Sequence, residues 1–205
     1  METNNGERIY IDYLNMNYEN FDIYQKSHFK RYIYAKDLIK NKIVGDFACG
    51  TGYGTQILSE NNKKVIGIDL NKNVIDSLNM KKYSNIEFIN RNLLDLNFNS
   101  ELDSIVSFET IEHLDEININ KLFKLFNQSL VRKGLFVFST PYMQKESEDA
   151  RRHHSTFQIN ENKVEEWCIN NGFSVLRMKY QNYISHEIEN NLSKKDFIIC
   201  ESIKI

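Results

Sequence analysis

Three glycines at alternate positions, Gly50, Gly52 and Gly54, follow a short run of strand-forming residues. Asp69 ends a second such run, at about the 20-residue distance that separates a glycine turn from a ribose-binding acid. Glycine permits positive φ angles and lets a ligand approach the backbone closely. A carboxylate can accept both hydrogen bonds of a ribose diol. These residues therefore predict a half-site that binds a nucleoside.

A second group of reactive side chains lies farther along the chain. Glu109 and His113 follow a predicted strand, and Arg151, His153 and His154 belong to a short basic run. Histidine can act as a base near neutral pH, and arginine can bind a phosphate or a carboxylate. Each group also has a simpler interpretation: a histidine that makes a structural hydrogen bond, and a basic loop that is merely solvated.

Alternating strands and helices are expected to position these groups. Strands are predicted at 43–47, 65–69, 86–90, 103–108 and 134–139, with helices at 21–40, 53–61, 73–80, 117–130 and from Asn160 to Asn171 and Gly172. Two closing strands, at 173–180 and 197–205, have no clear helix between them. The pattern predicts an α/β fold of Rossmann-like type. We expect a seven-stranded, mostly parallel sheet flanked by helices, with an antiparallel strand pair at the C-terminal edge.

Length and composition indicate one globular domain, residues 1–205. The chain is 41% hydrophobic with a formal net charge of −2, which disfavours a general nucleic-acid binder. Its three cysteines are far apart and show no metal-ligand spacing, so neither a disulfide framework nor a metal site is expected. The polar N-terminus and the lack of a long apolar run predict no signal peptide and no membrane span, and hence a cytoplasmic location.

In this order and spacing, the motifs resemble those of the class I S-adenosylmethionine-dependent methyltransferases, in particular a bacterial small-molecule and sugar-pathway type. The resemblance covers most of the chain and rests on the segments 28–32, 46–55, 65–69, 107–114 and 138–142. The chain departs from the family pattern at three positions in or beside these segments, and the family's usual turn before the fifth strand is reduced to Arg132, Lys133 and Gly134. Gly45 stands where a leucine is usual, Ala48 where a glycine is usual, and Asn92 where an aspartate is usual.

The resemblance implies that S-adenosylmethionine is the cofactor. Gly50 and Gly52 would pass under its methionine part, Asp69 would bind its ribose, and Asp46 would lie near its ammonium group; the alternative for Asp46 is a buried structural acid. The other residues that the resemblance places at the cofactor are Arg31, Leu70, Asn92, Leu93 and Phe108. Residues 1–40 are expected to form a helical lid with Arg31 available to the cofactor's carboxylate, or else a surface helix that packs on the core.

For catalysis the resemblance points to His154, His113 and Glu109, and for substrate binding to Tyr142, Arg151 and His153. It implies O-methylation of a small polar precursor, carrying a sugar or a phosphate, of a bacterial cell-surface polysaccharide. Two alternatives stay open: methylation of a lipid, quinone or other metabolite, and a catalytically silent module that binds an S-adenosyl nucleoside. The partner expected is a small-molecule acceptor and no nucleic acid, and the sequence leaves homo-oligomer formation open.

Overall fold

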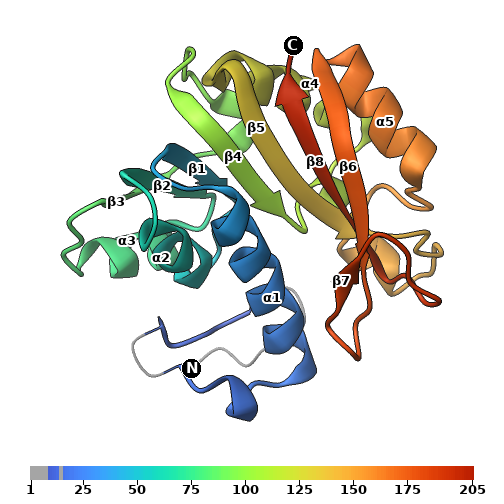
Figure 1. Ribbon diagram of the computed structural model, residues 1–205, viewed down its shortest axis with the longest axis horizontal. Helices are drawn as coiled ribbons and strands as arrows, with labels where there is room; N and C mark the ends of the chain where they lie inside the picture. The colour runs from blue at the N-terminus through green and yellow to red at the C-terminus, as the bar shows by residue number, and fades with distance from the viewer. Residues whose placement is uncertain (1–8, 14–15) are drawn as a thin grey trace.

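The computed structural model describes residues 9–13 and 16–205. One sheet of eight strands runs through it, in the order β3-β2-β1-β4-β5-β8-β6-β7 (Figure 1). The strands are β1 (Ile43–Phe47), β2 (Lys64–Asp69), β3 (Ile86–Asn90), β4 (Leu102–Phe108), β5 (Leu130–Pro141), β6 (Phe173–Gln181), β7 (Ile188–Glu189) and β8 (Phe197–Lys204). Strands β1 to β5 are parallel, and β8 lies antiparallel between β5 and β6. The predicted fold class is confirmed.

Two details of the sheet differ from the prediction. The sheet has eight strands and not seven, because the two-residue strand β7 pairs with the end of β6 through Tyr180 and Gln181. Strand β5 begins at Leu130 and not at Gly134, because the preceding helix ends at Ser129 and Leu130 already pairs with Leu102 of β4. Strand β5 therefore extends across the position where a turn was expected.

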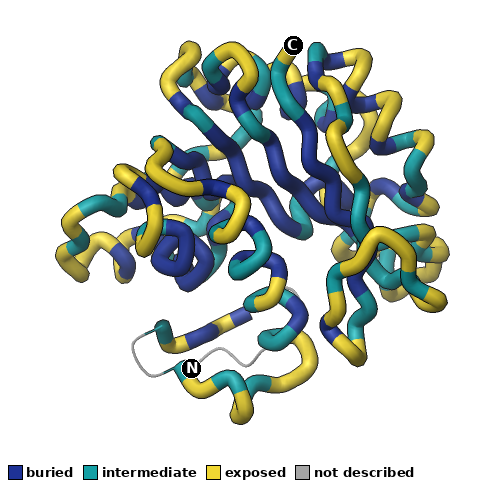
Figure 2. Tube along the Cα trace, viewed as in Figure 1, coloured by how far each residue is buried: buried dark blue, intermediate teal, exposed yellow. Residues whose placement is uncertain are grey.

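Helices cover both faces of the sheet. They are α1 (Ile23–Leu38), α2 (Tyr53–Ser59), α3 (Lys72–Asn79), α4 (Glu116–Ser129) and α5 (Glu161–Asn170). Helices α4 and α5 pack on one face with Phe136 and Phe138, whereas α1 and α2 pack on the other face with Val137. This alternation along β5 is the two-residue period of a strand that is buried on both sides. Figure 2 shows the buried central strands between exposed helix surfaces and loops.

Polar side chains fix the starts of the helices. Asp22 and Gln25 form a reciprocal capping box at the start of α1. Asn71, Asp115 and Asn160 cap α3, α4 and α5, each by accepting a hydrogen bond from a backbone N–H in the first turn. The predicted cap at Asn160 is thus confirmed.

Helix α1 is the central part of the predicted N-terminal lid, and it sits directly on α2. A Cβ atom at Gly54 would lie 2.1 Å from the Tyr32 ring, so only glycine allows this approach. Tyr32 also packs edge-on against Phe108, with ring centroids 5.1 Å apart. Residues 1–8 and 14–15 of the predicted lid lie outside the described residues. Among the described residues, no helix has both the length and the apolar character needed to cross a membrane.

Candidate functional site

The glycine turn follows β1 directly. Ala48, Gly50 and Gly52 have φ angles of 62°, 53° and 79°, which lie in the left-handed region. The left-handed backbone at position 48 explains why the family usually has a glycine there, since glycine adopts this conformation without strain. Gly50 and its chain neighbours aside, no atom of the described residues lies within 4 Å of the position that a Cβ at Gly50 would take, whereas a Cβ at Gly52 would meet Leu78 at 2.8 Å. The space beside Gly50 fits a ligand that approaches the backbone.

Asp69 is held at the tip of β2 by the backbone around it. Its Oδ2 accepts a hydrogen bond from the N–H of Gly50 at 2.9 Å, and its Oδ1 accepts one from the N–H of Asn71 at 2.8 Å. Each carboxylate oxygen keeps a second lone pair, which can accept a hydroxyl of a diol. Asn90, which sequence reasoning missed, donates from Nδ2 to the carbonyls of Asp69 and Leu70 and so fixes the chain after the strand. The same hydrogen bonds therefore fix the glycine turn and the Asp69 carboxylate relative to each other.

Asp46 is a buried acid that links three elements. Its Oδ1 accepts a hydrogen bond from the Tyr32 hydroxyl at 3.1 Å, and its Oδ2 accepts one from the Thr55 hydroxyl at 2.6 Å. Burial raises the pKa of Asp46 to about 7, against the two hydroxyl bonds, which lower it. Its position matches the structural alternative, and its contact with the cofactor's ammonium group stays a prediction.

Arg31 of α1 is fully buried and points to the end of β4. Its guanidinium lies over the Phe197 ring at 4.5 Å, and one nitrogen lies 3.4 Å from Oε1 of Glu109. None of the three guanidinium nitrogens has a hydrogen-bond partner among the described residues. Unsatisfied buried donors cost free energy, and a carboxylate accepts well from a guanidinium. The site therefore fits a ligand that brings a carboxylate to Arg31, as S-adenosylmethionine does.

The other predicted cofactor residues lie along the same edge. Leu70 is exposed, Phe108 is buried against Tyr32, and Leu93 is half-buried beside the core under α4. Asn92 is exposed, and its Oδ1 accepts from the N–H of Leu94, which caps a short 3₁₀ turn. That bond uses one of the two lone pairs of Oδ1, and the contact of Asn92 with the cofactor stays a prediction.

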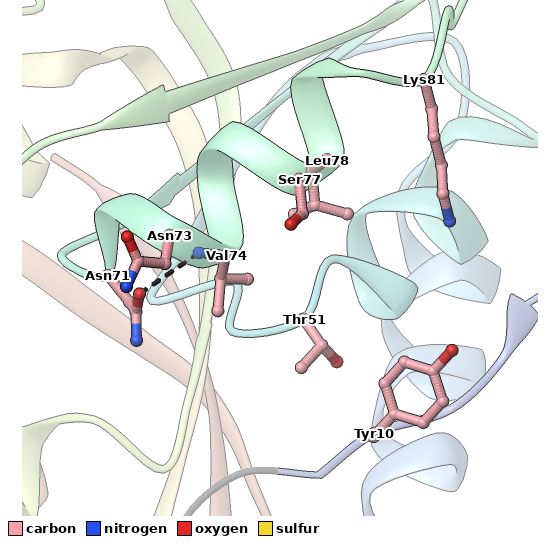
Figure 3. Close-up of a pocket in the computed structure, with 8 residues that line it drawn as sticks. All are labelled: Tyr10, Thr51, Asn71, Asn73, Val74, Ser77, Leu78 and Lys81. Atoms are coloured by element: carbon pink, nitrogen blue, oxygen red, sulfur yellow. Dashed lines mark hydrogen bonds between the residues drawn. The ribbon is translucent and has the colours of Figure 1, made fainter. Parts of the chain in front are cut away.

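A groove of about 460 Å³ runs between α3, the glycine turn and the N-terminal segment (Figure 3). Its lining residues are Tyr10, Thr51, Asn71, Asn73, Val74, Ser77, Leu78 and Lys81. Figure 3 shows the Tyr10 ring, on the N-terminal segment, near Thr51 of the glycine turn, with α3 on the opposite side of the groove. Asn71 belongs both to this groove and to the backbone that holds Asp69. The groove therefore adjoins the predicted ribose site, and the sequence alone did not predict it.

Glu109 directly follows β4 in a left-handed backbone conformation. Its φ angle is 51°, which is uncommon for a residue other than glycine and typical of functional sites. The Ser139 hydroxyl donates to Oε1 of Glu109 at 2.6 Å, and the N–H of Glu109 donates to the Ser139 carbonyl at 3.1 Å. Glu109 is therefore fixed between Arg31 and the end of β5.

His113 and His154 meet beyond Glu109, with ring centroids 5.0 Å apart. Between Glu109 and His113 lies Glu112, which sequence reasoning missed although it precedes a predicted site residue. Its buried carboxylate accepts from the Thr140 hydroxyl at 3.2 Å, and burial together with the charge of Glu109 raises the pKa of Glu112 well above its usual range. The structure thus brings two predicted catalytic residues, His113 and His154, together beside the buried acid Glu112.

Backbone bonds hold the histidine loop at both ends. The N–H of Met143 donates to the Ile159 carbonyl at 2.8 Å, and the N–H of Gln158 donates to the Gln144 carbonyl at 3.0 Å. Ser155 and Thr156 both donate their N–H groups to the Glu112 carbonyl, at 2.8 and 3.1 Å. His154 is consequently fastened to the turn that carries Glu112 and His113.

The predicted substrate-binding residues are not gathered at one point. Arg151 forms an exposed ion pair with Glu146 at 2.7 Å. His153 is exposed, and its carbonyl accepts from Nδ1 of His113 at 2.7 Å. Tyr142 donates its hydroxyl to Glu161 of α5, beside β6. Their substrate contacts stay predictions.

Known proteins show the same fold and, over part of the chain, the same sequence pattern. Residues 44–134 match the family model described as a methyltransferase domain. A probable S-adenosylmethionine-dependent methyltransferase of Mycolicibacterium smegmatis is 28% identical over 96 residues, which are 45% of this chain and 35% of the relative. The chain thus matches only about a third of this curated relative's length.

Solved structures resemble the chain over most of its length. An S-adenosylmethionine-dependent methyltransferase from Mesorhizobium loti superposes with a TM-score of 0.71, at 13% identity, over 92% of this chain and 100% of that one. The N-methyltransferase NodS of Bradyrhizobium japonicum, in complex with S-adenosylhomocysteine, gives 0.68 at 14% identity, over 91% of this chain and 89% of its own. At these identities the likeness shows the fold. Residues 44–134 thus match a methyltransferase domain, and the chain as a whole has the fold of the S-adenosylmethionine-dependent methyltransferases to which it is similar.

Proposed function

We propose that this chain methylates an oxygen atom of a small polar acceptor that carries a sugar or a phosphate. The acceptor class follows from the bacterial small-molecule and sugar-pathway methyltransferases that the motifs resemble, and it would make the product a precursor of a cell-surface polysaccharide. We place the reaction in the cytoplasm, in a single domain with α1 as part of a lid. S-adenosylmethionine, once bound, supplies an electrophilic methyl group on a sulfonium sulfur.

One observation carries this proposal most: the guanidinium of Arg31, buried and without a hydrogen-bond partner among the described residues, beside Glu109. The Gly50 turn and Asp69 lie at the same carboxyl edge of the sheet, where ligands of such sheets bind. Arg31 would bind the cofactor's carboxylate, Asp69 its ribose, and the open backbone at Gly50 would let it lie close. The packing of α1 over this edge would exclude water.

The acceptor would bind on the other side of Glu109, toward His113 and His154. A hydroxyl acceptor must lose its proton during transfer, and imidazole accepts protons near neutral pH. An acceptor that is already anionic would need no base, and the same residues would then only position it. The exposed Arg151 lies in the same loop and would meet a phosphate on the acceptor only after leaving Glu146.

A nitrogen acceptor is the second candidate, because NodS, a structural neighbour, is an N-methyltransferase. Purified protein should be incubated with S-adenosylmethionine and matched panels of sugar nucleotides, sugar phosphates, amino sugars, quinones and lipids, while S-adenosylhomocysteine formation is measured. Turnover with hydroxyl acceptors alone supports the proposal, and turnover with amino sugars alone replaces it with N-methylation. Cofactor binding without turnover in any panel, including quinones and lipids, would support a silent binding module.

A further inference from the structure

Two histidines and a buried glutamate gather at the carboxyl ends of β4 and β5. The atoms with which Glu112, His113 and His154 could bind a metal all lie within 4.8 Å of one another. Ligand atoms at about 2.0–2.2 Å from one tetrahedral ion lie roughly 3.4 Å apart, so rotation of the side chains would have to bring the three atoms closer together. The expectation of no metal site rested on spacing along the sequence, and this cluster joins segments that the spacing does not connect.

Hydrogen bonds set the protonation of both imidazole rings. Nδ1 of His113 donates to the His153 carbonyl at 2.7 Å, and Nδ1 of His154 donates to Oε1 of Gln144 at 2.6 Å. Both partners are carbonyl oxygens, which only accept, so each ring carries a proton on Nδ1, and in its neutral form it presents the lone pair of Nε2. Histidines that bind metals almost always donate their other ring N–H to such an oxygen. The tautomers therefore match those of metal ligands.

Glu112 would supply the negative charge of the cluster with an ion bound. It is 1% exposed, and its Oε2 accepts from the neutral Thr140 hydroxyl at 3.2 Å. Among the described residues, no lysine or arginine forms an ion pair with it. A divalent cation next to this carboxylate would compensate its buried charge.

We propose that Glu112, His113 and His154 bind one divalent transition-metal ion, for which Zn²⁺ fits the donor set best. Two imidazoles and one carboxylate are the protein ligands of one class of catalytic zinc site, which keeps a further position for water or substrate. That position would bind an oxygen of the methyl acceptor and favour its ionised form. This role of the ion rests on the proposed function, whereas metal binding itself does not.

The test uses the full chain without a histidine tag, stripped with a chelator and dialysed. Titration with ZnCl₂ is followed by calorimetry, and titration with CoCl₂ is followed by visible absorption, in the absence of S-adenosylmethionine and acceptor. We expect one ion per chain and the visible bands of Co²⁺ bound by nitrogen and oxygen ligands. Absence of stoichiometric binding overturns the proposal.

Variants then locate the ion. His154→Ala, His113→Ala and Glu112→Gln should each weaken metal binding by about 100-fold or more, because losing even a residue that only orients a ligand costs roughly 10–100-fold. His153→Ala is the matched control, because only the carbonyl of His153 contacts His113 and this carbonyl is retained. Equal affinity in His153→Ala and His154→Ala would mean that the ion binds elsewhere and would overturn the proposal.

Gln144 is a positioning residue in this proposal. Gln144→Leu should lower metal affinity by about tenfold, because Nδ1 of His154 loses its acceptor, and Gln144→Glu should restore the affinity. Circular dichroism and S-adenosylhomocysteine titration on the same samples show whether each variant folds. A wild-type chain that binds S-adenosylhomocysteine but no metal overturns the metal site alone. A chain that binds metal but no S-adenosylhomocysteine overturns the proposed function alone.

Discussion

The cofactor side and the acceptor side of this molecule are built in different ways. On the cofactor side, the backbone N–H of Gly50, in the turn after β1, donates to the carboxylate of Asp69 at the end of the neighbouring strand β2. On the acceptor side, His113 meets His154 only because the loop after β5 folds back on the turn after β4. The first arrangement joins a turn to the adjacent strand, and the second joins two loops that follow different strands. Substitutions should therefore separate cofactor binding from methyl transfer.

The largest effect is expected at Arg31. Arg31→Met should weaken S-adenosylhomocysteine binding by about 100-fold or more, since charge-assisted hydrogen bonds contribute roughly 1.5–3 kcal/mol each and a carboxylate accepts two. Calorimetric titration measures the affinity, and Lys30→Met, at an exposed neighbouring position of α1, is the control. Unchanged affinity in folded Arg31→Met would assign Arg31 to packing against Phe197 and would weaken the proposed lid.

His154→Ala tests the other side of the comparison. We expect methyl transfer to fall by about 100-fold, the usual contribution of a group that handles a proton. Affinity for S-adenosylhomocysteine should stay within about twofold, because the ring contacts Gln144 and His113 and lies away from the glycine turn. The matched control is Lys145→Ala, at an exposed position of the same loop. Normal transfer by His154→Ala would leave the loop a surface feature and make Glu109 the first residue to examine.

Asp69→Ala should lower S-adenosylhomocysteine affinity by at least about tenfold, because hydrogen bonds to a charged carboxylate contribute roughly 1.5–3 kcal/mol each. The same change releases the N–H groups of Gly50 and Asn71, so some loss of stability is also expected. Asp69→Asn retains one acceptor oxygen and should show a smaller loss of affinity. Chemical denaturation with and without ligand separates the two effects, and a loss of stability alone would return Asp69 to a capping role.

The smallest effect concerns pH and the buried acid Asp46. Its pKa is raised from 3.8 to about 7, so the folded chain holds a proton that the unfolded chain has already released. This contribution to stability is complete below pH 4 and is lost as the pH rises through about 7. Between pH 5 and 6 the free energy of unfolding should fall by at most about 1.4 kcal/mol relative to Asp46→Asn. Urea denaturation of both proteins across this range would show no relative change if Asp46 were ionised throughout.

The comparison also explains what the sequence could predict. Strand β1, the turn glycines, Asp69 and the Asn160 cap depend on short-range patterns, and the structure has them where they were expected. The start of β5 was misplaced, because the residues before Gly134 look like the end of a helix and pair with β4 only in the folded sheet. Local propensity is overridden by such long-range pairing.

The acceptor side was predicted as separate residues and not as a cluster. Glu109, His113 and His154 were identified, but Glu112 was missed, because nothing local in the sequence shows that Thr140 and the loop carrying His154 close over it. The bonds that join Glu112 to Ser155 and Thr156 form only when the loop after β5 folds back on the turn after β4. A site whose side chains come from such distant segments can be recognised only in the tertiary structure.

The loop after β5, which backbone bonds hold at its base and at its far limb, has a consequence for how the proposed acceptor specificity could change. The backbone bonds between Met143 and Ile159, and between Gln144 and Gln158, close the base of the loop, and the Glu112 carbonyl fixes its far limb. Most of the intervening residues, 145–152, are exposed. Residues 145–152 can therefore be replaced, in evolution or in a combinatorial library, while the backbone bonds around them keep His113 and His154 in place.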